Sequence, residues 1–490
     1  MFFKDPCTIP RRACRAVARP HERRPTSRHG CAEKDVIRNV EAGYGTRVAI
    51  PHCRSTDSRA SSQRSIRAMK HPALWSSFLL FHALAAHAVS PRPADMIDLD
   101  RPLDHYLWIT THNAANHGGL LPNQSFDITE QLQRGVRGLM LDIHERDGRL
   151  FTCHADCTFG RKAPLTEDMG AVSRYLDTHP DAVITLQLED YYRRGAMDAF
   201  VRDNAGLFKH SFKPGDPRWT ALRGQWPTLR ELIAADQRLL VLTQRAELSG
   251  AYADGAITFM HDQAVTAENY WSLGATIFTH DTTCRPRWSG IPLDATDQPL
   301  GLPRLFVMNH FHGAPFSWHS GVDNRLDTVV QRLDTACLPA AKRMPNYLAI
   351  DFIEWGDMLE FAETYNNGGL FAFADNGATG GPICSFSTAF ERNWSLASAP
   401  RMGCENNTIR SLVFRGARQG QRVTLHDAAD GDTQRAYTVI DVLQDIAWNQ
   451  PQSVERLDLE FDSAYLRVRP FKGGPLDGSV SHISVEPAAR

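Results

Sequence analysis

Two histidines, His112 and His154, each stand where a short apolar run ends. His112 and Asn113 close LDHYLWITTHN, and His154 lies in RLFTCHADC between Cys153 and Cys157. A single histidine in such a place is most often a satisfied core residue. Two imidazoles that face each other suit phosphodiester cleavage, because one can remove a proton from the attacking hydroxyl while the other protonates the leaving oxygen. The pair therefore predicts acid–base chemistry on a phosphodiester.

Further polar side chains end other apolar runs and fit such a site. They are Asp142, His144, Glu189, Asp190, Arg245, Asn309, His310 and Asp351. Buried ionisable groups are costly unless they are paired or functional, so packing alone does not account for this set. Arg245 can hold a phosphate through two hydrogen bonds. The oxygens of Asn113, Asp142 and Glu189 suit Ca²⁺ or Mg²⁺ better than zinc, and a network of ion pairs that orients the histidines is the alternative.

The elements that would position these residues alternate between apolar runs and helical stretches, which indicates a parallel sheet covered on both faces. The predicted strands are 103–110, 135–144, 182–190, 238–245, 304–311, 346–353 and 369–375, and the predicted helices are 127–135, 166–180, 228–237 and 356–367. Seven strands over ~280 residues approach a (β/α)₈ TIM-like barrel, whose catalytic groups lie at the carboxyl ends of strands. An open doubly wound sheet competes, but no glycine-rich phosphate loop follows any strand.

The character of the chain changes near residue 385. Segments such as QRVTLHDAADGD and RAYTVIDVL alternate β-branched and polar residues and end in Asp-Gly or Gly-Gly turns. This pattern predicts a separate all-β domain. We therefore expect an α/β barrel domain over 95–384, which contains the catalytic residues, and an all-β accessory domain over 385–490.

The start of the chain has a different charge from the rest. Residues 1–68 hold 15 Lys and Arg against 6 Asp and Glu, whereas 89–490 hold 38 against 50. MKHPALWSSFLLFHALAAHA, beginning at Met69, has the layout of a secretory signal peptide and is too short to span a membrane. A signal peptide is read at an N-terminus, so we interpret 69–88 as the signal and 1–68 as an upstream extension. A disordered basic arm is the alternative, and the expected location is extracellular or periplasmic.

Six cysteines follow the signal segment, an even number that export permits to form disulfides. Their order along the chain suggests the pairs Cys153–Cys157, Cys284–Cys337 and Cys384–Cys404. Their spacing does not match a thiolate zinc site. The acidic charge after residue 88 and the lack of a basic, aromatic stripe argue against nucleic acid as a partner.

The order THN (111–113), RGLMLDIH (137–144), LFTCHADC (150–157) and VITLQLED (183–190) resembles the X-type catalytic domain of phosphatidylinositol-specific phospholipases C. It is most similar to the secreted, single-barrel PLC-like phosphodiesterases. The resemblance covers about residues 100–380. It implies that an inositol hydroxyl attacks the adjacent phosphorus, which releases diacylglycerol and leaves a cyclic phosphodiester.

Carried over residue by residue, the resemblance implies His112 as general base and His154 as general acid. Asp351 matches an aspartate that can hold the second imidazole in its tautomer, and Arg245 matches a residue that contacts the headgroup. His144 stands where metal-independent bacterial enzymes have an arginine, so we assign it to substrate binding as well.

The family has two electrostatic solutions, and this chain departs from both. Asn113, Asp142 and Glu189 match the calcium-dependent form, but Met140 replaces the first acid of its Glu-x-Asp pair. Three protein ligands can still hold a divalent ion, which favours Ca²⁺ or Mg²⁺ over a metal-independent site.

The predicted function is cleavage of a phosphoinositide-like phosphodiester, with a phospholipid as partner and transient contact with a membrane surface. Phe316, Trp318 and Trp355 are candidates for that contact. The alternatives are a glycerophosphodiester or sphingophospholipid phosphodiesterase, and a barrel that binds lipid headgroups without catalysis. Headgroup choice depends on loops that the motifs do not determine.

Overall fold

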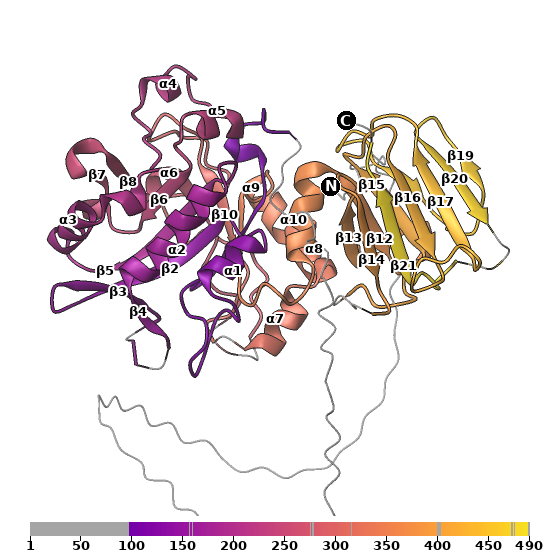
Figure 1. Ribbon diagram of the computed structural model, residues 1–490, viewed down its shortest axis with the longest axis horizontal. Helices are drawn as coiled ribbons and strands as arrows, with labels where there is room; N and C mark the ends of the chain where they lie inside the picture. The colour runs from indigo at the N-terminus through magenta and orange to yellow at the C-terminus, as the bar shows by residue number, and fades with distance from the viewer. Residues whose placement is uncertain are drawn as a thin grey trace, which may run out of the picture. The chain divides into compact units, whose positions relative to one another are not determined.

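One curled sheet forms the barrel. The computed structural model describes residues 98–488, except 156, 159, 275, 277–278, 315, 399–402, 472–473 and 475. Eight parallel strands follow the order β8-β6-β5-β2-β1-β11-β10-β9 (Figure 1). They are β1 (Trp108–Thr111), β2 (Gly138–Arg146), β5 (Ile184–Tyr191), β6 (Leu239–Thr243), β8 (Ile257–His261), β9 (Thr266–Glu268), β10 (Leu305–Asn309) and β11 (Tyr347–Ile350). Helix α6 (Asp262–Val265) connects β8 to β9, and no ladder pairs these two strands within the described residues. The predicted barrel is confirmed in this irregular form.

Three short antiparallel strands extend the same sheet. They are β3 (Arg149–Cys153), β4 (Lys162–Pro164) and β7 (Gly250–Tyr252). β3 runs back along β2, with Thr152 opposite Ile143, and β4 pairs with β3. The chain after β3 therefore returns toward Asp142, which is how His154 comes to the carboxyl end of the barrel.

The helices begin and end where local sequence requires it. They are α1 (Ile128–Gln133), α2 (Leu165–Thr178), α3 (Arg194–Asp203), α4 (Pro217–Thr220), α5 (Leu229–Ala234), α7 (Ser317–Asp323), α8 (Leu326–Arg332), α9 (Leu338–Ala341) and α10 (Met358–Asn367). Asp127 caps α1 by accepting a hydrogen bond from the Glu130 amide, and Thr228 with Glu231 forms a reciprocal capping box at α5. All four predicted helices are confirmed within a few residues.

Shorter turns complete the regular elements. The 3₁₀ turns are Leu103–His105, Ala205–Phe208, Ala246–Leu248, Ala253–Gly255 and Asn376–Ala378, and a π turn spans Leu333–Cys337. The first of these turns occupies the start of the strand predicted over 103–110, so β1 begins later than expected.

The last strand predicted for the barrel belongs to another sheet. β12 (Gly369–Phe373) pairs antiparallel with β13 (Cys384–Ser387) and β15 (Ser411–Arg415). The prediction of a parallel barrel strand over 369–375 is therefore wrong, because a fully apolar strand is buried equally well inside a sandwich. The barrel uses β8 and β9 instead, and the sequence analysis predicted neither.

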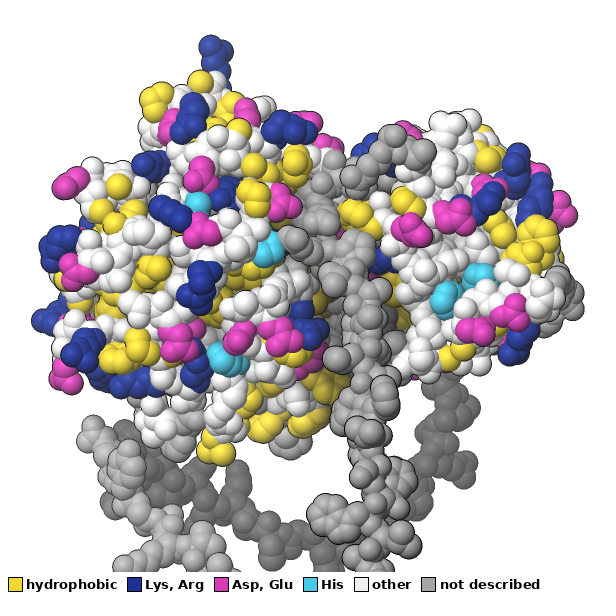
Figure 2. Space-filling view, in the orientation of Figure 1, with side chains coloured by type: hydrophobic (Ala, Val, Ile, Leu, Met, Phe, Trp, Pro, Cys, Tyr) yellow, Lys and Arg dark blue, Asp and Glu magenta, His cyan; other side chains and the backbone are white. Residues whose placement is uncertain are grey.

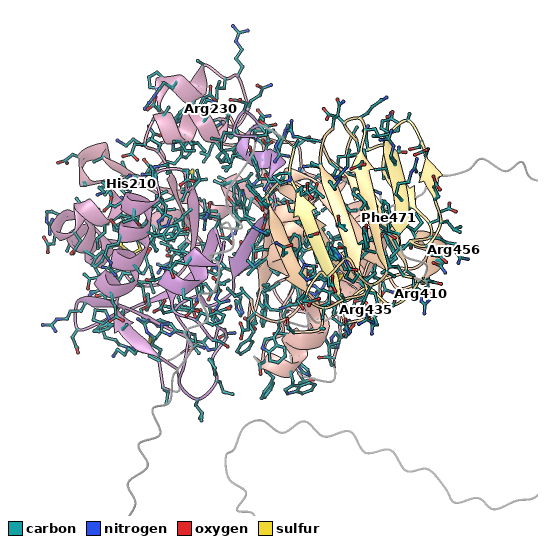
Figure 3. The ribbon with its side chains drawn as sticks, turned by 45° about the vertical axis from the view of Figure 1, so that its right-hand side comes forward. His210, Arg230, Arg410, Arg435, Arg456 and Phe471 are labelled. Carbon is teal, nitrogen blue, oxygen red and sulfur yellow. A yellow bond between two sulfur atoms is a disulfide. The ribbon has the colours of Figure 1, made fainter. Side chains whose placement is uncertain are left out.

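The C-terminal region is all-β, as predicted, and consists of two antiparallel sheets with apolar residues between them. One sheet has the order β13-β12-β15-β18 and the other β14-β21-β16-β17-β20-β19. The remaining strands are β14 (Arg392–Ser395), β16 (Arg422–His426), β17 (Tyr437–Val442), β18 (Gln452–Val454), β19 (Phe461–Asp462), β20 (Leu466–Phe471) and β21 (His482–Glu486). Arg410, Arg435 and Arg456, marked in Figure 3, each pair with an aspartate.

The three disulfides predicted from the order of the cysteines are confirmed. They join Cys153 to Cys157, Cys284 to Cys337 and Cys384 to Cys404. The predictions for residues 1–68 and for the signal segment 69–88 lie outside the described residues. Among the described residues, no helix combines the length and apolar character needed to cross a bilayer. On the face drawn in Figure 2, acidic and basic side chains are interspersed.

Candidate active site

The centre of the site is a histidine–aspartate pair at the carboxyl ends of β1 and β11. His112 Nδ1 lies 2.9 Å from Asp351 Oδ1. The Asn123 side-chain amide donates to both carboxylate oxygens of Asp351, at 3.1 and 3.2 Å. The carboxylate is nearly fully buried, whereas the imidazole is 17% exposed. Asp351 therefore contacts His112, and not the second imidazole as the sequence analysis expected.

The ring of His112 has one orientation because it is held on its face as well as its edge. It stacks on Phe311 with the ring centroids 3.6 Å apart and an interplanar angle of 8°. Since Asp351 occupies Nδ1, Nε2 is the nitrogen left for the pocket that His112 lines. A neutral imidazole held in this way can accept a proton at Nε2.

The chain leaves β1 through a left-handed residue. The His112 amide still donates to the Ile350 carbonyl, as a continuation of the β1–β11 ladder, but Asn113 has φ +46°. Asparagine tolerates this conformation better than most residues. The side-chain nitrogen of Asn113, Nδ2, donates to Asn123 Oδ1 at 3.2 Å. The side-chain oxygen of Asn113, Oδ1, is therefore the atom available to a cation.

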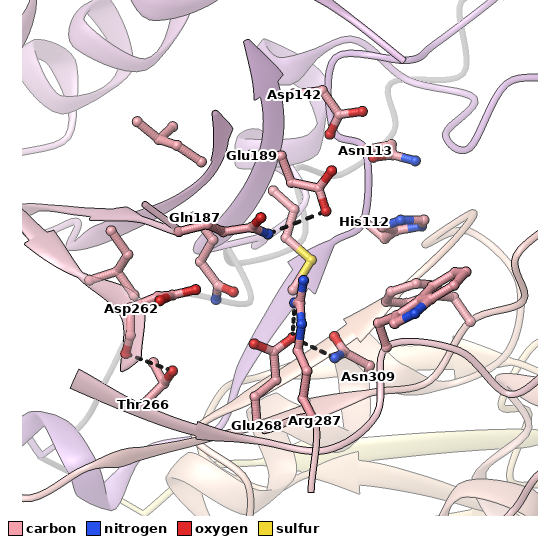
Figure 4. A pocket seen from close by; sticks show the side chains of 16 residues that line it. His112, Asn113, Asp142, Gln187, Glu189, Asp262, Thr266, Glu268, Arg287 and Asn309 are labelled. Carbon is pink, nitrogen blue, oxygen red and sulfur yellow. Dashed lines mark hydrogen bonds and ion pairs between the residues drawn. The ribbon is translucent and has the colours of Figure 1, made fainter. Parts of the chain in front are cut away.

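Two acidic side chains, Asp142 and Glu189, lie side by side on neighbouring strands. Asp142 and Glu189 are direct partners in the β2–β5 ladder, and both line the pocket of about 560 Å³ (Figure 4). Burial raises the pKa of Asp142 to about 7, and the charge of Glu189 acts in the same direction. Asp142 Oδ1 is buried and has no hydrogen-bond partner among the described residues. The site thus contains an acceptor that nothing in the described chain satisfies.

His154 approaches the same acids from the β3 hairpin. It lines a small recess together with Asn113, Asp142 and Cys153. Burial lowers the pKa of the His154 imidazole, and the neighbouring His112 lowers it further. The structure therefore brings together five of the predicted residues: His112, His154, Asn113, Asp142 and Glu189, with Asp351 behind them.

The opposite wall of the pocket contains residues that the sequence analysis did not select. Glu268 Oε1 accepts from Arg287 Nη1 at 2.7 Å and from Asn309 Nδ2 at 2.6 Å (Figure 4). Burial lowers the pKa of the Arg287 guanidinium, but the negative charges around it, that of Glu268 above all, raise it by more. The pKa of the guanidinium therefore lies above its usual value. Burial and Glu268 also raise the pKa of Asp262 to about 7. Recognition of β8 and β9 as strands would have revealed these acids.

The two residues assigned to substrate binding, Arg245 and His144, do not line the pocket. The Arg245 guanidinium donates to Glu247 and to the Tyr192 carbonyl, beside a separate shallow recess. His144 stacks on Tyr191 with ring centroids 4.4 Å apart and is not among the residues that line the pocket. The basic side chain that the structure does place in the pocket is Arg287.

Comparison with known proteins identifies the family to which the barrel region is similar. The family described as PI-PLC X 1 matches residues 100–366. A PI-PLC X domain-containing protein of Arabidopsis thaliana is 27% identical over 329 residues, which cover 63% of this chain and 69% of that protein. PI-PLC X domain-containing protein 1 of Arthroderma benhamiae is 26% identical over 317 residues, which cover 60% of this chain and 96% of its own length. The phosphatidylinositol-specific phospholipase C from Listeria monocytogenes aligns with 56% of this chain and 98% of its own, at 13% identity and a TM-score of 0.38.

The barrel places this chain in the class of proteins that contain a PI-PLC X domain. The family match extends over more than half of the chain and ends at α10, before the sandwich. This chain belongs to the PI-PLC X domain family.

Proposed function

We propose that this protein is an exported phosphodiesterase of the phospholipase C type that cleaves a phosphoinositide-like phosphodiester. The observation that carries the proposal is the His112–Asp351 pair at a pocket that His112 and Arg287 line. His154 lines an adjoining recess, which shares Asn113 and Asp142 with that pocket. An oriented base, a second imidazole and a half-buried guanidinium suit phosphodiester cleavage.

His112, Asp351 and His154 each have one role in the proposed reaction. His112 Nε2 takes the proton from the inositol hydroxyl next to the phosphodiester, while Asp351 stabilises the imidazolium that forms. The hydroxyl oxygen bonds to phosphorus, the bond from phosphorus to the glycerol oxygen breaks, and His154 gives that oxygen a proton. The products are a cyclic inositol phosphodiester and diacylglycerol. The lowered pKa of His154 makes its protonated form a stronger acid toward the leaving oxygen.

Asn113, Asp142 and Glu189 fit a divalent cation, Ca²⁺ above Mg²⁺. Their donors are all oxygens, Asp142 Oδ1 is unsatisfied, and the two carboxylates stand side by side on adjacent strands. A bound cation would supply positive charge to the phosphate oxygens. Met140 lines the same pocket where a further acid would complete the set, so we expect water or substrate to fill the remaining positions.

An apolar rim supports a lipid substrate. Leu120, Leu121 and Phe316 line one surface recess with Trp355. Trp318, the second residue of α7, is 57% exposed. Exposed aromatic and aliphatic groups that cluster on a soluble domain commonly mark an interaction surface. Leu120, Leu121 and Trp355 lie in the loops that follow β1 and β11, so a bilayer seated there would present headgroups near His112. The disulfides support an oxidising, extracellular location.

Initial rates on defined substrates test the proposal. Vesicles containing phosphatidylinositol, vesicles containing sphingomyelin, and soluble glycerophosphoinositol would each be supplied to the full chain, with Ca²⁺ and after removal of Ca²⁺. We expect phosphatidylinositol to be preferred and Ca²⁺ to raise the rate. A preference for sphingomyelin would show that the substrate is a sphingophospholipid and not a phosphoinositide. Vesicle binding without turnover of any substrate would show that the barrel binds lipid without catalysis.

A further inference from the structure

A second group of histidines lies outside the pocket. His280 Nε2 is 2.8 Å from Asp323 Oδ1, and His312 Nε2 is 3.0 Å from Asp323 Oδ2. The two Nε2 atoms are 3.3 Å from each other. These three residues come from three separate segments: the loop between β9 and β10, the residues after β10, and the last residue of α7. They converge on one point.

We propose that His280, His312 and Asp323 bind a zinc ion. An ion with Zn–N distances of about 2.0–2.1 Å and tetrahedral angles separates two nitrogens by about 3.3 Å. The two Nε2 atoms are 3.3 Å apart, which matches this N–N separation. The Asp323 carboxylate would supply a further ligand oxygen.

The donor set selects the kind of metal. Two imidazoles and one carboxylate suit zinc and also Fe²⁺, while Ca²⁺ and Mg²⁺ prefer oxygen ligands throughout. His312 and Asp323 are almost fully buried, and the His280 side chain is 45% exposed, so the third ligand faces solvent and leaves an entry path. Water would occupy the fourth position. The other cluster of donors, His144 with Cys153 and Cys157, is unsuitable because the two sulfurs form a disulfide.

The arrangement differs from an ordinary structural histidine. His210, marked in Figure 3, also contacts carboxylates, but through different nitrogens: Nδ1 to Asp236 at 2.7 Å and Nε2 to Asp177 at 3.1 Å. Its partners lie on opposite edges of one ring, so no common point is surrounded by donors. At Asp323, by contrast, two imidazole nitrogens and a carboxylate surround one point, an arrangement that a single hydrogen-bonded histidine does not need.

The position of the zinc site indicates what the ion would do. The loop between β9 and β10 carries Trp271 and Arg287 into the wall of the pocket. On the other side, Asn324, which follows α7, donates its side-chain amide to the Asp351 carbonyl at 2.9 Å. The zinc ion would therefore fasten the pocket wall to the segment behind Asp351, alongside the Cys284–Cys337 disulfide. We assign it a positioning role rather than a catalytic one.

Metal content and zinc titration of the full chain test this site. The protein would be treated with a chelator, dialysed, and titrated with zinc chloride by calorimetry, with metal content measured by mass spectrometry. We expect about one zinc per chain in the wild type, loss of that zinc in H280N, and a Tm that rises with zinc in the wild type only. H280N alters an exposed side chain, so the fold should survive the substitution.

Two controls separate this site from others. H210N removes a buried histidine of similar contacts, and D142N removes an acid from the proposed calcium site. Both variants should keep their zinc. The zinc site is independent of the proposed function, so an inactive protein that binds one zinc still supports it. No stoichiometric zinc in the wild type, or zinc retained in H280N, would overturn it.

Discussion

Two histidine–aspartate groups stand beyond the carboxyl ends of adjacent strands, β11 and β10, and their carboxylates are almost equally buried. Asp351 receives one imidazole and two hydrogen bonds from the Asn123 amide. Asp323 receives two imidazoles, one on each oxygen. The Asp351 carboxylate, which also accepts from an amide, can orient a single base. The Asp323 carboxylate, which contacts two imidazoles, can hold both of them around a cation. Similar residues thus serve two different kinds of site.

The largest expected effect separates the two groups directly. H112N removes the base, so kcat/KM on phosphatidylinositol should fall by ~10²–10⁴. H280N should lose zinc and keep kcat/KM within about tenfold, because His280 supports the pocket wall without contacting substrate. H105N is the matched control: His105 is exposed and precedes β1, at the opposite end of the strand from His112. Equal losses in H112N and H280N would remove the distinction.

Two arginines sharpen the account of the pocket. R287A should lower kcat/KM by roughly 10–100-fold, the equivalent of ~1.5–3 kcal/mol for a hydrogen bond to a charged group. R245A should change it by less than about twofold, because the guanidinium is engaged by Glu247 outside the pocket. Steady-state kinetics on both variants would decide. A larger loss in R245A would restore the role that the sequence suggested.

The oxygen-lined site should respond to pH through the carboxyl group of Asp142. A proton on Asp142 competes with Ca²⁺ because its pKa is raised to about 7, so Ca²⁺ affinity should fall about tenfold per pH unit below 7. Without Ca²⁺, the raised pKa makes the folded state lose stability as the pH rises toward 7. Calcium titrations at several pH values check the first effect, and Tm after Ca²⁺ removal checks the second. In D142N both dependences should weaken; an unchanged pH dependence would exclude Asp142 as the source.

The smallest effect concerns α7, which carries Asp323 at one end and Trp318 near the other. W318A removes an exposed ring from the rim, so the ratio of activity on vesicles to activity on soluble substrate should fall about three- to fivefold, a fraction of the free energy of burying such a ring. Vesicle sedimentation measures the binding itself. If W318A kept full vesicle binding, the rim would not be the lipid-contacting surface.

Much of this architecture could be predicted from the sequence, because long apolar strands such as 182–190 and capped helices such as 228–237 carry their pattern locally. His112, His154 and the acids of β2 and β5 were found in the same way. β8 and β9 were missed because they are short and lie on either side of one helical turn, which gives no alternation to detect. Arg287 sits in a loop with no periodicity at all.

Pairing across the chain could not be predicted from local pattern. Whether Asp351 holds His112 or His154 depends on which strands are neighbours, and the β1–β11 pairing decides it. The same holds for His280, His312 and Asp323, which are separated by 32 and 11 residues and have no motif spacing. β12 shows the limit most clearly, since its apolar run gives no information about which sheet it joins.

The central claim is that His112 activates a substrate hydroxyl for attack on phosphorus within the same molecule. Phosphorus NMR of phosphatidylinositol vesicles during turnover tests it most directly, since a cyclic phosphodiester has a resonance distinct from those of acyclic phosphates. The account predicts that the wild type forms the cyclic inositol phosphodiester first and that H112N forms almost none. A first product that is acyclic, or a cyclic product formed equally fast by H112N, would contradict it.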